Sequence, residues 1–202
     1  TRLLGRQKDI DNAALAIVNA KKPLILLGNQ VTQNKEALPQ FIKSLNKLSI
    51  PTYTSGMSRG CFNEDDAFFM RHHRKHALKN ADVVLTIGLP LDFRLGYGSS
   101  INKNAKIIAI NKSKTDMKKN RKPFIGIHGD PTRAMCEIAK VINPPKCTEW
   151  LKELNVLEKE GRTDTLCNLF NLTDSAVHQI PIGVSILAFS FCYTLSPMIK
   201  YT

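Results

Sequence analysis

The sequence is short of acidic residues and lacks the motifs that mark several common enzyme classes. It contains no GxxxxGK[ST], HExxH or GxSxG, so nothing supports a P-loop triphosphatase, a zinc metalloprotease or an α/β-hydrolase. Its five cysteines include no CxxC pair, which argues against a disulfide framework and for a reducing compartment, on the cytoplasmic side. No secretory signal opens the chain. The chain begins at Thr1 without an initiator Met, from which we expect a fragment or a processed protein.

The shortage of acids falls on the first part of the chain. There are 29 Lys and Arg residues against 17 Asp and Glu, and residues 1–142 carry a net charge of +13 while the remainder carries −1. This excess favours an anionic partner such as a phosphate-bearing ligand, an acidic protein or a membrane surface. The alternative is a lysine-rich solvated surface. Nucleic acid is not expected as a partner, because the charges are scattered and no recognition motif with interleaved aromatics occurs.

Strand-like and helix-like segments alternate along the first part of the chain. Short apolar, β-branched runs bounded by glycine predict buried strands, and apolar residues at helical spacing predict the helices between them. This alternation predicts an α/β fold, a Rossmann-like doubly wound parallel sheet flanked by helices, followed by an irregular helical and apolar tail. The predicted strands are residues 21–28, 50–54, 81–88, 105–111 and 124–130, and the predicted helices are residues 9–20, 35–48, 65–80 (at least its second half), 130–142 and 148–160.

Glycine-bearing loops follow the predicted strands. Ligands of open parallel sheets bind at the carboxyl ends of the strands, near the point where the strand order reverses. The pattern therefore predicts a binding site made from these loops. The glycines concerned are Gly28, Gly56 with Gly60, Gly88 and Gly129.

The segment IGLPLDFRLGYG, residues 87–98, contains the most polar of these loops. Asp92 and Arg94 are two residues apart, so in an extended segment both would face the ligand crevice. Arg94 would then suit a phosphate, since guanidinium binds phosphate through two hydrogen bonds. In the alternative, Asp92 holds Arg94 in a plain salt bridge. The GxG within this segment is not a full dinucleotide fingerprint.

The run RHHRKH, residues 71–76, places His72 and His76 on one face of a predicted helix. Zinc would need neutral imidazoles and a third ligand, and the three interspersed cations would repel it. We therefore interpret the run as a solvated basic helix, or one that touches a ligand phosphate, and predict no metal site.

Five motifs in order resemble the central domain of thiamine diphosphate-dependent enzymes: KKPLILLGNQV, LSIPTYTSGMSRGCF, LKNADVVLTIGLPLDFRLGYG, AKIIAIN and IHGD. SRG and DFRLGYG make the chain most similar to the acetolactate synthase-like branch, which includes 2-hydroxyacyl-CoA lyases. The resemblance implies a linker remnant at residues 1–8, the central domain at 9–142, a helical linker at 143–160 and an unmatched tail at 161–202. Residues 180–199 of the tail carry no charge and reach the length of a membrane span, although Pro181 and Pro197 interrupt them; the alternative is a terminus that does not fold natively.

What the resemblance implies is a three-domain enzyme in which thiamine diphosphate and Mg²⁺ are held by two other domains. The central domain binds FAD in the acetolactate synthase branch, and ADP or the CoA nucleotide in CoA-lyase relatives. The resemblance also implies a homodimer or homotetramer at full length and association with the endoplasmic reticulum membrane. It implies no catalytic residue in this chain, and a nucleotide-binding set of Gly28, Asn29, Ser55, Gly56, Arg59, Gly60, Gly88, Asp92, Arg94 and Asn111.

Two functions from different classes remain open on the sequence. In the first, the chain supplies the nucleotide-binding central domain of a thiamine diphosphate-dependent carboligase or lyase and is not catalytic alone. In the second, it is a non-enzymatic nucleotide-binding or dimerisation scaffold derived from that domain. A membrane-tethered protein anchored by residues 180–199 is a third possibility.

Overall fold

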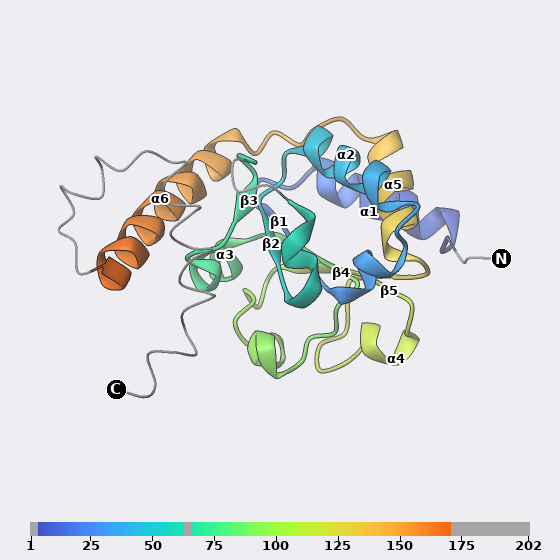
Figure 1. Ribbon diagram of the computed structural model, residues 1–202. Helices are drawn as coiled ribbons and strands as arrows, with labels where there is room; N and C mark the ends of the chain where they lie inside the picture. The colour runs from blue at the N-terminus through green and yellow to red at the C-terminus, as the bar shows by residue number, and fades with distance from the viewer. Residues whose placement is uncertain (1–3, 63–65, 171–202) are drawn as a thin grey trace. The chain divides into compact units, whose positions relative to one another are not determined.

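The computed structural model describes residues 4–62 and 66–170, with side chains through Thr165. Its centre is a six-stranded sheet in the order β3-β2-β1-β4-β5-β6, and every neighbouring pair of strands is parallel (Figure 1). The predicted α/β fold with a parallel sheet is thereby confirmed. The strands are β1 (Pro23–Leu27), β2 (Thr52–Thr54), β3 (Phe69–Met70), β4 (Val83–Ile87), β5 (Lys106–Asn111) and β6 (Ile125–His128).

Helices cover both faces of the sheet, as expected for strands that are apolar on both sides. In Figure 1, α1, α2 and α5 lie together on one side of the strands, and α3 lies on the other. Three short 3₁₀ helices, η1 to η3, follow β1, β2 and β4. The helices are α1 (Gln7–Val18), η1 (Asn29–Gln33), α2 (Leu38–Leu48), η2 (Gly56–Cys61), α3 (Arg74–Asn80), η3 (Phe93–Gly98), α4 (Lys114–Met117), α5 (Pro131–Val141) and α6 (Thr148–Phe170).

The alternating side chains of the strands divide the interior into two cores. In β1, Ile25 and Leu27 pack with α1, α2 and α5, whereas Leu24 and Leu26 pack with α3 and the start of α6. All five residues of β1, and likewise of β4, are buried. This is why their sequences read as continuous apolar runs and why both strands were predictable.

Two predicted helices begin later in the structure than expected. The segment predicted as helix from residue 65 instead forms β3, which pairs with β2, and α3 begins only at Arg74. His73 caps α3 in a left-handed conformation with φ 51°. The prediction that His72 and His76 share a helical face was therefore wrong. Similarly, α2 begins at Leu38 rather than residue 35, because residues 35–37 form a turn in which the N–H groups of Ala37 and Leu38 donate to Asn34 O.

Three other predicted helices are present in the structure, with bounds that differ from those predicted. Asp130 caps α5 as predicted, accepting from the backbone N–H groups of Thr132 and Arg133, with Pro131 at the first helical position. Helix α1 begins and ends two residues before the predicted positions. Helix α6 runs on through Gly161 to Phe170, since a single glycine costs a helix only about 1 kcal/mol. The chain divides into two compact units near Glu158, and the predicted tail from residue 171 onward lies outside the described residues.

The strand order reverses between β1 and β4, which makes this the switch point of the sheet. From β1 the chain moves outward to β2 and β3, then returns to β4 on the other side of β1. The two strand ends lie in direct contact: the Gly28 N–H donates to Ile87 O at 2.9 Å. A Cβ on Gly28 would stand 2.4 Å from both Gly88 O and Leu89 Cβ, so only glycine permits this approach.

The first part of α6 is anchored to the sheet by one indole and one buried acid. Trp150 is buried, and its Nε1–H donates to Pro23 O at 3.0 Å. Glu158 accepts from the backbone N–H groups of Arg71 and His72 and from His72 Nδ1, each at 2.8 Å. Burial alone raises the pKa of Glu158, but the hydrogen bonds from His72 and Arg71 outweigh it, so the pKa lies below the usual 4.5.

The depressed pKa makes the contribution of Glu158 to stability depend on pH. We expect Glu158→Gln to lower the free energy of unfolding by about 1.5–3 kcal/mol near neutral pH, because an amide replaces a carboxylate that accepts three hydrogen bonds. Because the pKa of Glu158 is lower in the folded protein than in the unfolded chain, its contribution to the free energy of unfolding is present above the unfolded-state pKa. That contribution is lost as the pH falls through the folded-state pKa. The difference between the two proteins should therefore shrink below a pH of about 4.5 in urea unfolding curves.

Glu153→Gln is the matched control, because Glu153 lies on the same helix and its ion pairs with Lys22 and His76 are exposed. Exposed pairs contribute little, so we expect a change within about 0.5 kcal/mol. An equal loss from both variants would contradict the special role of Glu158.

The close approach of Gly28 to Gly88 gives a second prediction, which compares alanine substitutions at two glycines, Gly28 and Gly60. Gly28→Ala should lower the free energy of unfolding by about 1–3 kcal/mol, because the backbone of Gly88 must shift to admit the methyl group. A Cβ on Gly60 would meet nothing within 4 Å, so Gly60→Ala should change stability by less than about 0.5 kcal/mol. Urea unfolding of both variants measures the difference; indistinguishable midpoints would disprove the close approach.

Candidate nucleotide-binding site at the switch point

Loops after β1, β2 and β4 surround a cavity of about 170 Å³ at the carboxyl ends of the strands. It lies where the sheet topology and the glycine pattern predict a binding site. Six residues of the predicted nucleotide-binding set line it, and four lining residues were not in that set. The first six are Gly28, Asn29, Ser55, Gly88, Asp92 and Arg94, and the other four are Gln30, Leu89, Pro90 and Leu95.

The floor of the cavity consists of backbone from the ends of β1 and β4. Gly88 has φ +71°, and a Cβ there would stand 2.9 Å from Gln30 Cβ. Its N–H donates to Ile110 O, while its carbonyl accepts from the Gln30 N–H at 3.3 Å. The two strand ends are thus fixed to each other and to β5, so the floor is rigid before any ligand arrives.

The loop after β2 is fastened to the loop after β1 by side chains. Asn29 Oδ1 accepts from the Met57 N–H at 2.9 Å, and a Cβ on Gly56 would collide with that oxygen. Ser55 and Ser58 cap the start of η2 reciprocally, and Ser58 Oγ also donates to Leu27 O. Gly56 therefore serves the junction between loops and does not itself line the cavity.

Asp92 and Arg94 form an ion pair on the rim of the cavity. Arg94 donates from Nη2 to Asp92 Oδ2 at 2.7 Å and from Nε at 3.1 Å, and its backbone N–H donates to Oδ1. The hydrogen bonds from the Arg94 side chain lower the pKa of Asp92 and raise that of Arg94. The expectation of an extended segment was wrong, because Asp92 caps η3, which begins at Phe93.

The pairing still leaves part of the guanidinium available. Asp92 accepts from Nε and Nη2, and within the described part of the chain Arg94 Nη1 has no hydrogen-bond partner. The Arg94 side chain is 48% exposed, so Nη1 can reach a ligand without the ion pair breaking. Arg94 is thus held in place by Asp92 and can donate to an anion at the same time.

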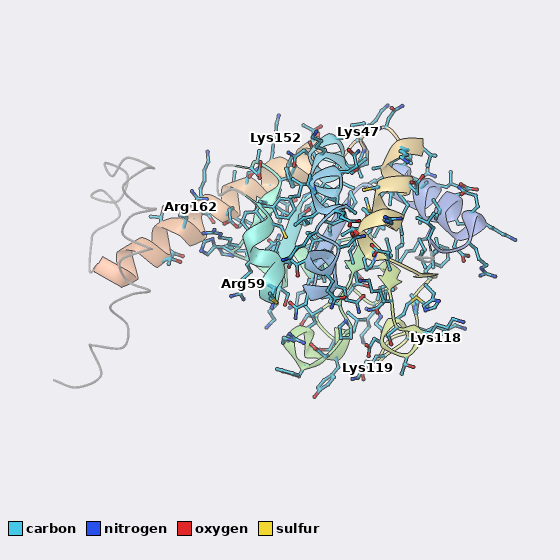
Figure 2. All side chains as sticks on the ribbon, turned by 45° about the vertical axis from the view of Figure 1, so that its right-hand side comes forward. Lys47, Arg59, Lys118, Lys119, Lys152 and Arg162 are labelled. Carbon is cyan, nitrogen blue, oxygen red and sulfur yellow. The ribbon has the colours of Figure 1, made fainter. Side chains whose placement is uncertain are left out.

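Gly60, Arg59 and Asn111 do not line the cavity. Arg59 and Gly60 are exposed on η2, and Figure 2 shows Arg59 on the outside of that segment. Asn111 is buried at the end of β5, where its Oδ1 accepts from Gln30 Nε2 at 2.9 Å and from the Ser113 N–H at 2.8 Å. Asn111 Nδ2 is buried and unpaired within the described residues. A direct contact between Asn111 and a ribose in the cavity would require Gln30 to move.

Gln30 is the polar lining residue that the sequence did not reveal. Its amide joins Asn111 to the Lys112 N–H, which links the loop after β1 to the loop after β5. A glutamine in a loop carries no motif of its own. Its only distinguishing feature in the sequence is its position directly after Gly28 and Asn29, at the end of the first predicted strand.

The size of the cavity suits part of a nucleotide. Pockets for drug-sized ligands measure roughly 300–1,000 Å³, whereas this cavity holds about 170 Å³, enough for a phosphate-sized group. No long helix begins at the loop after β1, since α2 starts ten residues after Gly28. Recognition of phosphate would therefore depend on Arg94 and loop backbone in place of a helix N-terminus.

Comparison with known proteins identifies the family of this chain. The family profile described as "Thiamine pyrophosphate enzyme, central domain" matches residues 10–138. "2-hydroxyacyl-CoA lyase 2" of Danio rerio is 39% identical over 155 residues, which cover 72% of this chain and 25% of that protein. The protein of the same name from Caenorhabditis elegans is 30% identical, covering 78% of this chain and 26% of its own length. A "Probable acetolactate synthase" of Mycobacterium bovis is 28% identical, covering 76% and 28%.

These matches confirm the resemblance on which the residues of the site were assigned. The chain spans about a quarter of the length of the curated relatives it matches. None of the helices in residues 4–62 and 66–170 combines the length and the apolar character that a membrane span requires. The chain belongs to the thiamine pyrophosphate enzymes, and its parallel sheet is their central domain, related to 2-hydroxyacyl-CoA lyase and acetolactate synthase.

Proposed function

We propose that this chain supplies the nucleotide-binding central domain of a thiamine diphosphate-dependent carbon–carbon lyase or carboligase. The names of its relatives support that reaction class, and the chain aligns with only about a quarter of their length. The sequence contains no GDG…N motif for the cofactor diphosphate and Mg²⁺. We therefore assign this chain a binding and scaffolding role, with thiamine diphosphate chemistry supplied by other parts of the enzyme.

The observation that carries the proposal is the cavity at the switch point with Arg94 on its rim. Rigid glycine backbone forms the floor, and a guanidinium fixed by Asp92 presents Nη1 to solvent. A phosphate seated there would place the rest of a nucleotide outside the cavity, because the hollow is too small to enclose it. ADP, the moiety common to FAD and, with a further phosphate, to CoA, is the ligand that this geometry suits.

The alternative is a scaffold without a ligand, and two observations favour it. Arg94 already has a carboxylate partner, and Asn111 is occupied by Gln30 and Ser113. The Arg94 side chain and the Asn111 amide oxygen thus have partners within the chain, although Asn111 Nδ2 has none among the described residues. The two proposals differ in a measurable way, because only the first predicts binding of ADP, FAD or CoA by the purified chain.

We expect the 202-residue chain to bind ADP, and Arg94→Ala to weaken that binding by about 1.5–3 kcal/mol, roughly 10- to 150-fold in Kd. The physical reason is the loss of a charged hydrogen bond from Nη1 to a phosphate oxygen. Isothermal titration calorimetry with ADP, and parallel titrations with FAD and CoA, measure the effect.

Arg59→Ala is the control, because it removes the same charge from an exposed side chain that does not line the cavity. It should change Kd less than twofold. Equal losses from both variants would point to general attraction by a basic surface. Absence of heat with all three nucleotides up to millimolar concentration would favour the scaffold.

A further inference from the structure

A second and larger hollow lies at the edge of the sheet, away from the switch point. It measures about 600 Å³, within the range of small-molecule sites, and shares no lining residue with the first cavity. The edge strand β6, the short helix α4 and the segment before α1 form it. Its lining comprises Gly5, Arg6, Asp9, Lys114, Met117, Lys118, Lys122, Pro123, Gly126 and His128.

The charge of this groove is strongly positive. Asp9 is the one acid among the described residues of its lining, and Arg6 already pairs with it, with Nε 2.8 Å from Oδ2. Lys114, Lys118 and Lys122 are exposed, and within the described residues none of them has a carboxylate partner. Figure 2 shows the Lys118 side chain projecting outward from its end of α4. Three uncompensated ammonium groups therefore surround one hollow.

The backbone around these lysines is braced. Ser113 caps α4 by accepting from the Asp116 N–H, and Lys114 and Lys118 are four residues apart, one helical turn. Arg121 donates to the carbonyls of Ile101, Asn102 and Lys103, which fixes the chain directly before Lys122. The lysine-bearing segment is thus positioned by its neighbours and is not a loose basic loop.

Gly126 leaves room for the end of the Met117 side chain to pack against β6. A Cβ at this position would stand 2.9 Å from Met117 Cε and 3.1 Å from its sulfur. Met117 and Gly126 line the groove together with the three lysines. Like charges that line one hollow repel one another, and a polyanion bound there would relieve that repulsion.

We propose that this groove binds a small molecule carrying two or more phosphate groups. Three lysines spread from Lys114 to Lys122 match several anionic groups better than one, and a hollow of this size accommodates a polyphosphate with an organic portion. The inference does not depend on the proposed function, because its residues, loops and strand differ from those of the switch-point cavity.

The test is titration of the ¹⁵N-labelled chain with inorganic tripolyphosphate, followed by the amide signals of the two sites. The Gly126 and His128 signals should move in a saturable manner at sub-millimolar concentration. Replacing Lys114, Lys118 and Lys122 together by Gln should raise the Kd at least about tenfold. Because all three are exposed, the variant should keep the thermal midpoint of the parent, which shows that it is folded.

The matched control replaces Lys35, Lys43 and Lys79 by Gln, which removes the same charge from exposed lysines outside the groove. It should leave the Kd within about twofold. Equal weakening by the two triple variants would overturn the proposal, since it would show non-specific attraction. Tripolyphosphate that shifts Gly28 and Gly88 and leaves Gly126 unmoved would also overturn it.

A lipid headgroup carries the same phosphates on a surface, so sedimentation with phosphatidylcholine vesicles containing a phosphoinositide separates the two sources. Because the groove is concave, we expect the chain to stay in the supernatant. Sedimentation that depends on the three lysines, with no response to free tripolyphosphate, would overturn the assignment to a small molecule.

Discussion

The candidate site depends on one contact, the direct approach of the Gly28 backbone to Gly88 at the ends of β1 and β4. Parallel strands on either side of a switch point send their loops in opposite directions, which leaves a hollow between them. Here both positions are glycine, so the two strand ends meet with almost no space between them, and the hollow is small. The cavity of about 170 Å³, its rigid floor and its dependence on a rim arginine all follow from that contact.

The scarcity of acids has a structural counterpart. Asp130 caps α5 and accepts from Asn34, Asp82 accepts from the N–H groups of Lys21 and Lys22, and Glu158 anchors α6. These carboxylates mainly accept hydrogen bonds within the fold, and among the described lysines only Lys112 lies within ion-pair distance of one of them, 3.8 Å from Asp130. Most of the net positive charge of residues 1–142 therefore lies on exposed side chains. Both hollows that we assign to anions are lined by residues of this range. Asp92 combines the two roles, because it caps η3 and aligns Arg94.

Much of the fold could be read from the residues because the central strands are buried on both faces. Their apolar runs identified β1, β4 and β5, and the glycines after β1, β2 and β4 located the loops that converge at the cavity. The strand β3 was missed, since Phe69 and Met70 are only two residues within a segment of helical composition, and pairing with β2 decided their conformation. Asn111 was assigned from its position at the end of β5, but its side chain is bonded to Gln30, which lies 81 residues earlier. Contacts of that kind carry no local signal. The basic groove was not predicted for the same reason. Arg6 and Lys118 line one hollow only after α1 and α4 have packed at β6.

The central claim is that the switch-point cavity receives a nucleotide phosphate. A crystal structure of the chain grown with ADP above its Kd tests this most directly. The account predicts density for a phosphate over Gly28 and Gly88, within hydrogen-bond distance of Arg94 Nη1, with the Asp92–Arg94 pair intact. A nucleotide bound elsewhere, with the cavity holding only solvent, would contradict it.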